Sequence, residues 1–241
     1  MSEYTALSVL RVAVTGGTSG LGLALVQDLR RTGAEVAFLA RHGDRVREVA
    51  RDIPGTHGIV GDVARKTETH VLAGRILAAL GGLDVLIHNA SSLGPVPLAL
   101  LADTECEDLE IALATNVLGP FRLTKALLGA LTASAREGRA ALVIHVVSDA
   151  ALTPYCGWGA YGASKAALWH LGRIWDEELK VHGVHMHAID PGDMDTPLHA
   201  LAVPDADRAS LKRPETSARE IVAHIEEHVR ASRERAGATS A

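Results

Sequence analysis

The sequence is poor in cysteine and in aromatic residues. Its 241 residues include two cysteines, Cys106 and Cys156, and only 3% Phe, Trp and Tyr. The cysteines show no metal-ligand spacing and fit a reducing compartment, so a disulfide framework or a zinc module is not expected. With so few aromatics, the core must be built from Ala, Val, Leu and Ile, as buried parallel sheets covered by helices usually are.

The sequence also lacks a basic run and a long apolar run. Its formal net charge is −5, whereas a nucleic-acid footprint needs clustered Lys and Arg. No apolar stretch approaches the roughly 18 residues that a membrane helix needs. The opening MSEYTALSVLR has neither the basic segment nor the cleavage site of a signal peptide. We therefore expect a cytoplasmic protein that binds small molecules, with no nucleic acid or membrane as a partner.

What the sequence does have is an alternation of short β-branched runs with longer amphipathic segments. The pattern predicts strands at 9–15, 35–40, 57–60, 84–88, 141–147 and 184–189, and helices at 20–31, 65–79, 104–134, 158–181 and 215–231. Because crossovers between parallel strands are right-handed, this predicts an α/β fold: a Rossmann-type doubly wound parallel sheet of about six strands, ordered 3-2-1-4-5-6, with helices on both faces. Ligands then bind at the carboxyl edge of the strands.

The length suits one domain of this kind, which we expect over residues 1–230. The polar Ala/Arg/Ser/Gly segment at 231–241 is expected to be a disordered tail. Residues 192–214 have no clear period and are rich in Pro and Asp. Such a segment is consistent with a mobile substrate lid.

The first expected strand runs into a glycine-rich turn, Thr-Gly-Gly-Thr-Ser-Gly-Leu-Gly at 15–22. Small residues let the backbone approach a pyrophosphate closely, and the N-terminus of the following helix offers free N–H groups and a partial positive charge. In this βαβ setting the run predicts a dinucleotide site rather than a simple turn. The expected cofactor-binding residues are Gly16, Thr18, Ser19, Gly20, Leu21 and Gly22.

The second expected strand is followed by a basic rather than an acidic residue. NAD-preferring enzymes usually have a carboxylate here for the ribose 2′-hydroxyl, whereas this chain has Arg41. Arginine can pair with the 2′-phosphate of NADP, which a carboxylate would repel. The alternative is that Arg41 is a solvated surface charge beside Arg45 and Arg47. The sequence favours NADPH over NADH, with Asp62 and Val63 flanking the adenine.

Four polar residues form a candidate catalytic group. Tyr161 and Lys165 stand one helical turn apart, so they share a helix face, and the ammonium would lower the pKa of the tyrosine. Ser148 ends the fifth expected strand, where its hydroxyl could donate to a substrate carbonyl oxygen. Asn116 could hold a water that links Lys165 to solvent. Together they would form a proton relay.

These motifs resemble the short-chain dehydrogenase/reductases, in the shorter branch that lacks an appended substrate domain. The resemblance covers residues 8 to about 230, with the motifs in the family's order and approximate spacing. It rests on the glycine-rich turn at 15–22, Asp62-Val63, Asn89-Ala90, Asn116, Ser148, Tyr161 with Lys165, and Pro191-Gly192 with Thr196.

The resemblance implies a catalytic tetrad of Asn116, Ser148, Tyr161 and Lys165. Tyr161 would be the general acid in reduction or the base in oxidation, and Lys165 would also hold the nicotinamide ribose. The further cofactor contacts that it implies are Asn89, Ala90, Tyr161, Pro191, Gly192 and Thr196, the last three closing over the nicotinamide.

The chain departs from the family pattern in two places. His88-Asn89-Ala90-Ser91 replaces the usual Asn-Asn-Ala-Gly, and we interpret His88 as a satisfied structural histidine rather than a catalytic one. The usual seventh strand is missing after Arg230. Its absence favours a homodimer through the helices at 104–134 and 158–181 over a tetramer.

The function expected from these residues is an NADPH-dependent carbonyl reductase or alcohol dehydrogenase. Loop residues at 92–95, 157–158 and 191–196 are similar to those of sepiapterin reductase, which makes a pterin-like or dicarbonyl substrate an alternative, with Trp158 and Tyr155 lining the pocket. A non-catalytic NADP-binding sensor is a second alternative, and a sugar-nucleotide epimerase would need a longer chain. Two histidine pairs, at 185 and 187 and at 224 and 228, lack a third ligand, so no metal site is expected.

Overall fold

A computed structural model describes residues 10–239 of the chain. Six strands form a single sheet: β1 (Arg11–Thr15), β2 (Glu35–Ala40), β3 (Thr56–Val60), β4 (Val85–His88), β5 (Leu142–Val146) and β6 (His185–Ile189). Their spatial order is β3-β2-β1-β4-β5-β6, and every neighbouring pair is parallel. The Rossmann-type order predicted from the sequence is therefore confirmed.

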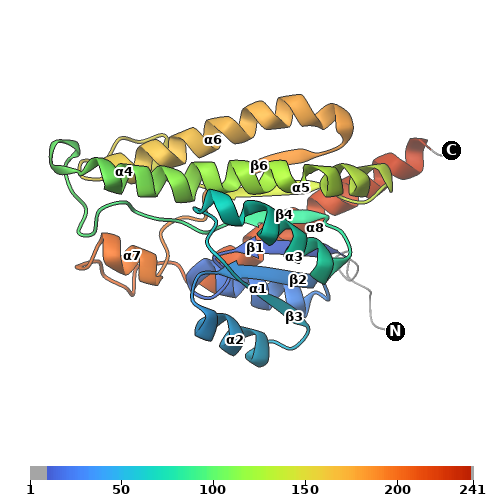
Figure 1. Cartoon of the computed structure of the whole chain (residues 1–241), viewed down its shortest axis with the longest axis horizontal. Coiled ribbons are helices and arrows are strands. Elements are labelled where there is room, and N and C mark those ends of the chain that lie inside the picture. Colours follow the sequence, from blue (N-terminus) through green and yellow to red (C-terminus); the bar gives the residue numbers. More distant parts are fainter. Residues whose placement is uncertain (1–9, 240–241) are drawn as a thin grey trace.

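Eight α-helices connect and cover these strands in the described part of the chain (Figure 1). They are α1 (Gly20–Arg31), α2 (Gly43–Asp52), α3 (Thr69–Leu80), α4 (Cys106–Leu113), α5 (Gly119–Arg136), α6 (Gly159–Leu179), α7 (Pro197–Ala202) and α8 (Pro214–Thr239). Short 3₁₀ turns occur at Lys66–Glu68, Leu101–Asp103, Asp149–Ala151 and Lys180–His182, and a π-helical turn at Ala114–Leu118 joins α4 to α5.

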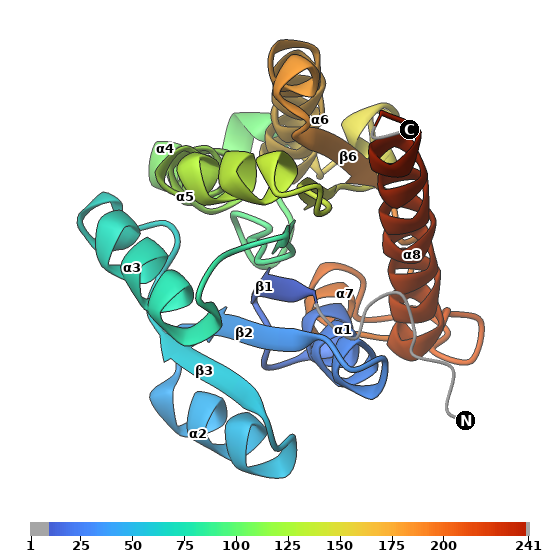
Figure 2. The same cartoon turned by 90° about the vertical axis from the view of Figure 1, so that its right-hand side faces the viewer.

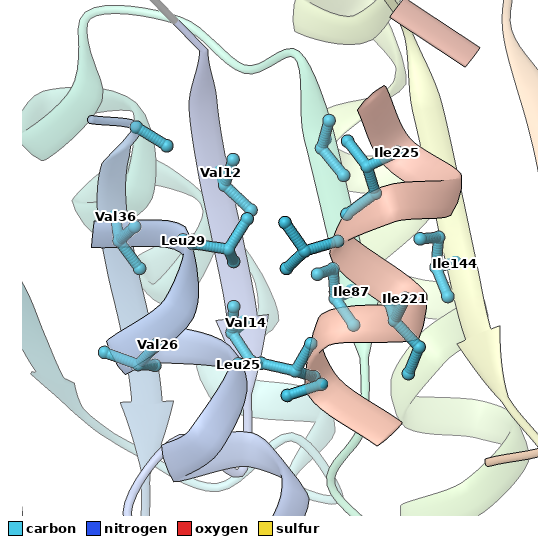
Figure 3. Packing of buried hydrophobic residues seen from close by; sticks show 14 of the residues in the cluster. Val12, Val14, Leu25, Val26, Leu29, Val36, Ile87, Ile144, Ile221 and Ile225 are labelled. Atoms are coloured by element: carbon cyan, nitrogen blue, oxygen red, sulfur yellow. The ribbon is translucent and has the colours of Figure 1, made fainter. Parts of the chain in front are cut away.

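The helices form a layer on each face of the sheet (Figure 2). On one face α1 and α8 pack together over the strands, and the buried side chains of this layer are almost all Val, Leu, Ile and Ala. Figure 3 shows Leu25 and Leu29 of α1 and Ile221 and Ile225 of α8 meeting the strands in this layer. On the other face α3, α5 and α6 cover a second apolar layer. Because helices cover both faces, the central strands β2, β1, β4 and β5 are largely buried and mostly apolar rather than alternating, whereas the edge strands β3 and β6 are less buried.

A buried carboxylate ties the amino ends of the strands together. Asp84, just before β4, accepts hydrogen bonds from the guanidinium of Arg11 at 2.8 Å and of Arg139 at 2.6 Å, and from the hydroxyl of Ser134. Burial alone would raise the pKa of Asp84, but these hydrogen bonds lower it to about 2. The charged network lies at the edge opposite the glycine-rich turn, where it stabilises the scaffold rather than a ligand site.

The structure corrects several boundaries. Helix α2 was not predicted, and the segment expected as one helix at 104–134 is two α-helices separated by the π-turn. The tail expected to be disordered from residue 231 is helical to Thr239, because its Ala, Arg and Glu residues are strong helix formers. The segment expected as a lid contains α7 and is tied down by a bridge between Met194 and Lys212. Within residues 10–239, no helix is long and apolar enough to cross a membrane.

Candidate active site

A cavity of about 640 Å³ opens at the carboxyl edge of the sheet. It is where an open α/β sheet places its ligand, outside the ends of the strands where the strand order reverses. The structure brings to it all the sequence-predicted site residues except Asn116, in two groups. The cofactor half is lined by Gly16, Thr18, Ser19, Gly20, Leu21, Gly22, Arg41, Asp62, Val63, Asn89 and Ala90, and the reaction half by Ser148, Tyr161, Lys165, Pro191, Gly192 and Thr196.

The glycine-rich loop between β1 and α1 is shaped by close backbone packing. Gly16 has a φ of +73°, a left-handed conformation that favours glycine, and its N–H donates to the carbonyl of Leu39 at 2.8 Å. A Cβ on Gly22 would lie 2.1 Å from the carbonyl oxygen of Gly16. Asn89 donates from Nδ2 to the carbonyl of Thr15 at 3.0 Å, so the end of β4 holds this loop in place. Such a loop leaves room for a pyrophosphate against the start of α1.

Arg41 and Asp62 line the cavity at the ends of β2 and β3. Arg41 is exposed, and no carboxylate partner is recorded for its guanidinium among the described residues. Arg45 and Arg47, in contrast, are ion-paired with Glu48 and Asp44 along α2. Arg41 is therefore placed to meet an anion that enters the cavity.

Tyr161 and Lys165 lie on the inner face of α6, 8% and 2% exposed. The ammonium of Lys165 is 5.5 Å from the centroid of the tyrosine ring and donates to the carbonyl of Val146 at 2.8 Å. Burial raises the pKa of Tyr161 to about 12 and lowers the pKa of Lys165 to about 8. The expected lowering of the pKa of Tyr161 is therefore wrong, because loss of hydration on burial is the largest influence on the phenol.

Asn116 is fully buried in the π-turn, and both ends of its side-chain amide have partners. Its Oδ1 accepts from Ser91 Oγ at 3.2 Å and from the N–H of Ser92 at 2.8 Å. Its Nδ2 donates to the carbonyl of Ser92 and to Ser164 Oγ, both at 2.8 Å. These bonds occupy both ends of the side-chain amide and tie the loop after β4 to helix α6, which carries the tyrosine. The expected role of Asn116 in holding a water stays a prediction.

Ser148 begins the 3₁₀ turn after β5 and faces Tyr161. Its hydroxyl accepts from the N–H of Ala150 at 3.2 Å and donates to Oδ1 of the adjacent Asp149 at 2.9 Å. A serine hydroxyl carries one proton, so donation to Asp149 competes with donation to Tyr161, which is also within hydrogen-bond reach, and with donation to a substrate oxygen. The phenol of Tyr155 donates to the other carboxylate oxygen of Asp149 at 2.6 Å, which lowers the pKa of the acid.

The loop after β6 forms one wall of the reaction half. Thr196 caps α7 by accepting the N–H of His199 at 3.2 Å, and its methyl group would lie 3.2 Å from a Cβ placed on Gly20. Ser217 of α8 donates to the carbonyl of Pro191 at 2.8 Å. The loop is thereby anchored on both sides, across the cavity from the tyrosine.

Sequence reasoning assigned no role to several residues that line the reaction half. These are Ser91, Thr115, Asp190, Asp193, Leu198, His199 and Leu201. The last three belong to α7, which had no periodic signal because it is six residues long. Tyr155 and Trp158 do line the cavity as expected.

The histidines of β4, β5, β6 and α8 contact other side chains of the fold. Nε2 of His88 is 2.7 Å from Thr124 Oγ1, which confirms its interpretation as a satisfied histidine. His88 also stacks on the buried His145, with ring centroids 5.3 Å apart. The two histidine pairs predicted on β6 and α8 meet, with Nδ1 of His187 2.7 Å from Nε2 of His224. No His, Cys, Asp and Glu cluster in the described residues has the arrangement of a metal site.

A doubly wound sheet with a glycine-rich loop at its first turn, and a tyrosine and lysine on a helix facing the same cavity, defines a nicotinamide-dependent oxidoreductase. The chain belongs to the short-chain dehydrogenase/reductase family, whose model, described as short chain dehydrogenase, matches residues 11–207.

Individual relatives agree with this assignment. The chain is similar to a 3-dehydrosphinganine reductase of Arabidopsis thaliana, with 33% identity over 77% of the chain, and spans 55% of that relative's length. It is 30% identical to an L-fucose dehydrogenase of Mus musculus, over 82% of the chain and 70% of the relative. A crystal structure of a short chain dehydrogenase from Burkholderia cenocepacia in complex with NADP has a TM-score of 0.81 and 25% identity, covering 92% of both chains.

Proposed function

We propose that this protein is an NADPH-dependent carbonyl reductase or alcohol dehydrogenase acting on a small molecule. The observation that carries the proposal is the convergence of Ser148, Tyr161 and Lys165 on one cavity whose other end is lined by the glycine-rich loop and Arg41. The residues present fit a dinucleotide: a glycine-rich loop whose backbone a pyrophosphate would approach closely, and an exposed arginine at the cavity that would pair with a 2′-phosphate.

Each residue has a definite task in the proposed reaction. When bound, NADPH supplies a hydride to the carbonyl carbon. Tyr161 donates its proton to the carbonyl oxygen and is left as a phenolate, which the ammonium of Lys165 stabilises. Because the pKa of Tyr161 is about 12, the phenol is protonated at neutral pH and is ready for reduction. Ser148 would steady the substrate oxygen, and Asn116 positions α6 through Ser164.

The test is a titration of the protein with NADPH and NADH, followed on the same sample by reduction of a panel of aldehydes, ketones and diketones. Tight NADPH binding with loss of NADPH absorbance on at least one carbonyl supports the proposal. NADPH binding with no turnover across the panel would contradict it and favour the sensor alternative. A preference for NADH would contradict the role of Arg41 while leaving the carbonyl chemistry in place.

A further inference from the structure

Asp149 lines the cavity next to the proposed catalytic Ser148. It directly follows Ser148, it is exposed to the cavity, and its two carboxylate oxygens are held apart by different donors. Oδ1 accepts a hydrogen bond from the hydroxyl of Ser148 at 2.9 Å, and Oδ2 accepts one from the phenol of Tyr155 at 2.6 Å. The turn is also capped by Ser148, whose hydroxyl oxygen accepts from the N–H of Ala150.

This arrangement gives the hydroxyl of Ser148 a charged acceptor that competes with a substrate oxygen. While its one proton points to Asp149, the serine has lone pairs to offer but no hydrogen for a substrate carbonyl oxygen. A substrate that brings a donor of its own for Oδ1 removes this competition. The hydroxyl of Ser148 then rotates toward the substrate, and its proton stays bonded to Oγ.

Covalent geometry says where such a donor must lie. In an α-substituted ketone, the carbonyl oxygen and a heteroatom on the neighbouring carbon are about 2.8 Å apart. That spacing matches the 2.9 Å between Ser148 Oγ and Asp149 Oδ1. A carbonyl oxygen on Ser148 therefore brings its α-substituent to the carboxylate.

The charge of the surroundings selects the kind of donor. Three carboxylates, those of Asp149, Asp190 and Asp193, line this half of the cavity. The ammonium of Lys165 is buried against Val146, and His199 lies 4.0 Å from Asp193, which leaves a surplus of negative charge. A cationic donor gains from such a field, whereas a neutral hydroxyl gains only the hydrogen bond.

We propose that Asp149 is a specificity-determining residue, and that the substrate carries a protonated amine on the carbon next to the reacting carbonyl. This rests on the proposed carbonyl reductase function and narrows its substrate class to α-amino carbonyl compounds. The amine occupies Oδ1 of Asp149, and its binding frees the proton of Ser148 for the carbonyl oxygen.

The experiment compares three ketones that differ only in the α-substituent: α-aminoacetophenone, α-hydroxyacetophenone and propiophenone. Reduction is followed by NADPH loss at about pH 6.5, where the amine is protonated. The amine should be favoured over propiophenone by about 10- to 100-fold in kcat/KM, the range of one charge-assisted hydrogen bond. The hydroxy compound should lie between them.

Variants separate this role from a structural one. Asp149→Asn should reduce the amine-to-propiophenone ratio to near one, and Asp149→Ala should also raise kcat/KM for propiophenone, because it frees Ser148. Tyr155→Phe keeps the carboxylate and should keep the ratio. Asp52→Asn removes the same charge from the exposed end of α2 and should leave kcat/KM unchanged for both the amine and propiophenone. Unchanged NADPH affinity in each variant shows that the fold is intact.

Equal turnover of propiophenone and the amine by the unmodified protein would overturn the inference while leaving the carbonyl reductase proposal standing. An equal fall in kcat/KM for the amine and for propiophenone in the Asp149 variants would also overturn it, because the loss of a merely structural residue would lower both. If none of the three ketones is reduced while other carbonyls in the panel are, the inference fails and the proposed function survives. If no carbonyl is reduced, both fail.

Discussion

Arg41 is the residue on which the expected preference for NADPH over NADH depends. It lines the cavity at the end of β2, and its guanidinium has no recorded ion pair among the described residues, whereas its neighbours on α2 are paired. Sequence alone left open whether it was a cofactor contact or a solvated charge. The structure places Arg41 at the cavity, and the preference of the protein for NADPH over NADH stays a prediction.

Replacing Arg41 by Ala should raise the Kd for NADPH by about 10- to 100-fold and leave the Kd for NADH nearly unchanged, because only NADPH carries the 2′-phosphate. Fluorescence titration of both cofactors measures this. Arg47→Ala is the matched control, since Arg47 is exposed and paired with Asp44 outside the cavity. An equal loss for both cofactors in the Arg41 variant would show that it acts on the loop rather than on the phosphate.

The sequence predicts which residues line the site, but it does not predict the surroundings of each side chain. Ser148, Tyr161 and Lys165 line one cavity, as their positions at a strand end and on one helix face predict, and their catalytic roles stay a prediction. The direction of the tyrosine pKa shift and the partners of Asn116 could not be read. Both depend on burial and on loops distant in sequence, such as the loop at 91–92 that saturates the asparagine amide.

At the scale of elements, the β1–α1 connection leaves very little space for side chains at its glycines. Gly22 packs against the carbonyl of Gly16, and the two glycines bring helix α1 close to the strand. Strands and long helices were predicted well because their apolar residues repeat along many positions. Helix α2 was missed because it is short and mostly polar, with only Val46 and Val49 buried.

Gly22→Ala should destabilise the protein and abolish NADPH binding, because its Cβ would lie 2.1 Å from the carbonyl oxygen of Gly16. The cost of overpacking is about 1–3 kcal/mol. Gly74→Ala is the control within α3, where a Cβ meets nothing within 4 Å, and it should raise Tm by removing backbone freedom from the unfolded chain. Thermal unfolding and cofactor titration of both variants check this, and a Gly22 variant that binds NADPH normally would contradict the loop assignment.

At the scale of the whole molecule, the sequence predicted strand order, sheet edge and site position together. These follow from one rule, the right-handed crossover, applied to an alternating pattern. Assembly was not predictable to the same degree. Ile111, Leu118, Ile174 and Val181 are exposed on or beside the helices expected to form a homodimer, and that dimer stays a prediction.

Buried histidines should make the stability of the whole fold depend on pH. Burial lowers the pKa of His145 from 6.5 to about 4, and lowers that of His88 well below 6.5. Between these values the unfolded chain binds more protons than the folded one, so stability should fall as the pH drops from 6.5 toward 4. Thermal unfolding measured across this range checks it. His145→Asn should flatten the slope, and an unchanged slope would assign the dependence to other groups.

The most direct test of the account is the Tyr161→Phe variant, measured for NADPH affinity and for carbonyl reduction on the same preparation. The substitution removes the proton donor and keeps the ring that packs against Trp158. We expect NADPH to bind with nearly unchanged affinity while turnover falls by a factor of at least about a hundred. A variant that still reduces carbonyls at a rate near that of the unmodified protein would show that Tyr161 is not the acid, and would contradict the assignment of this cavity as the catalytic site.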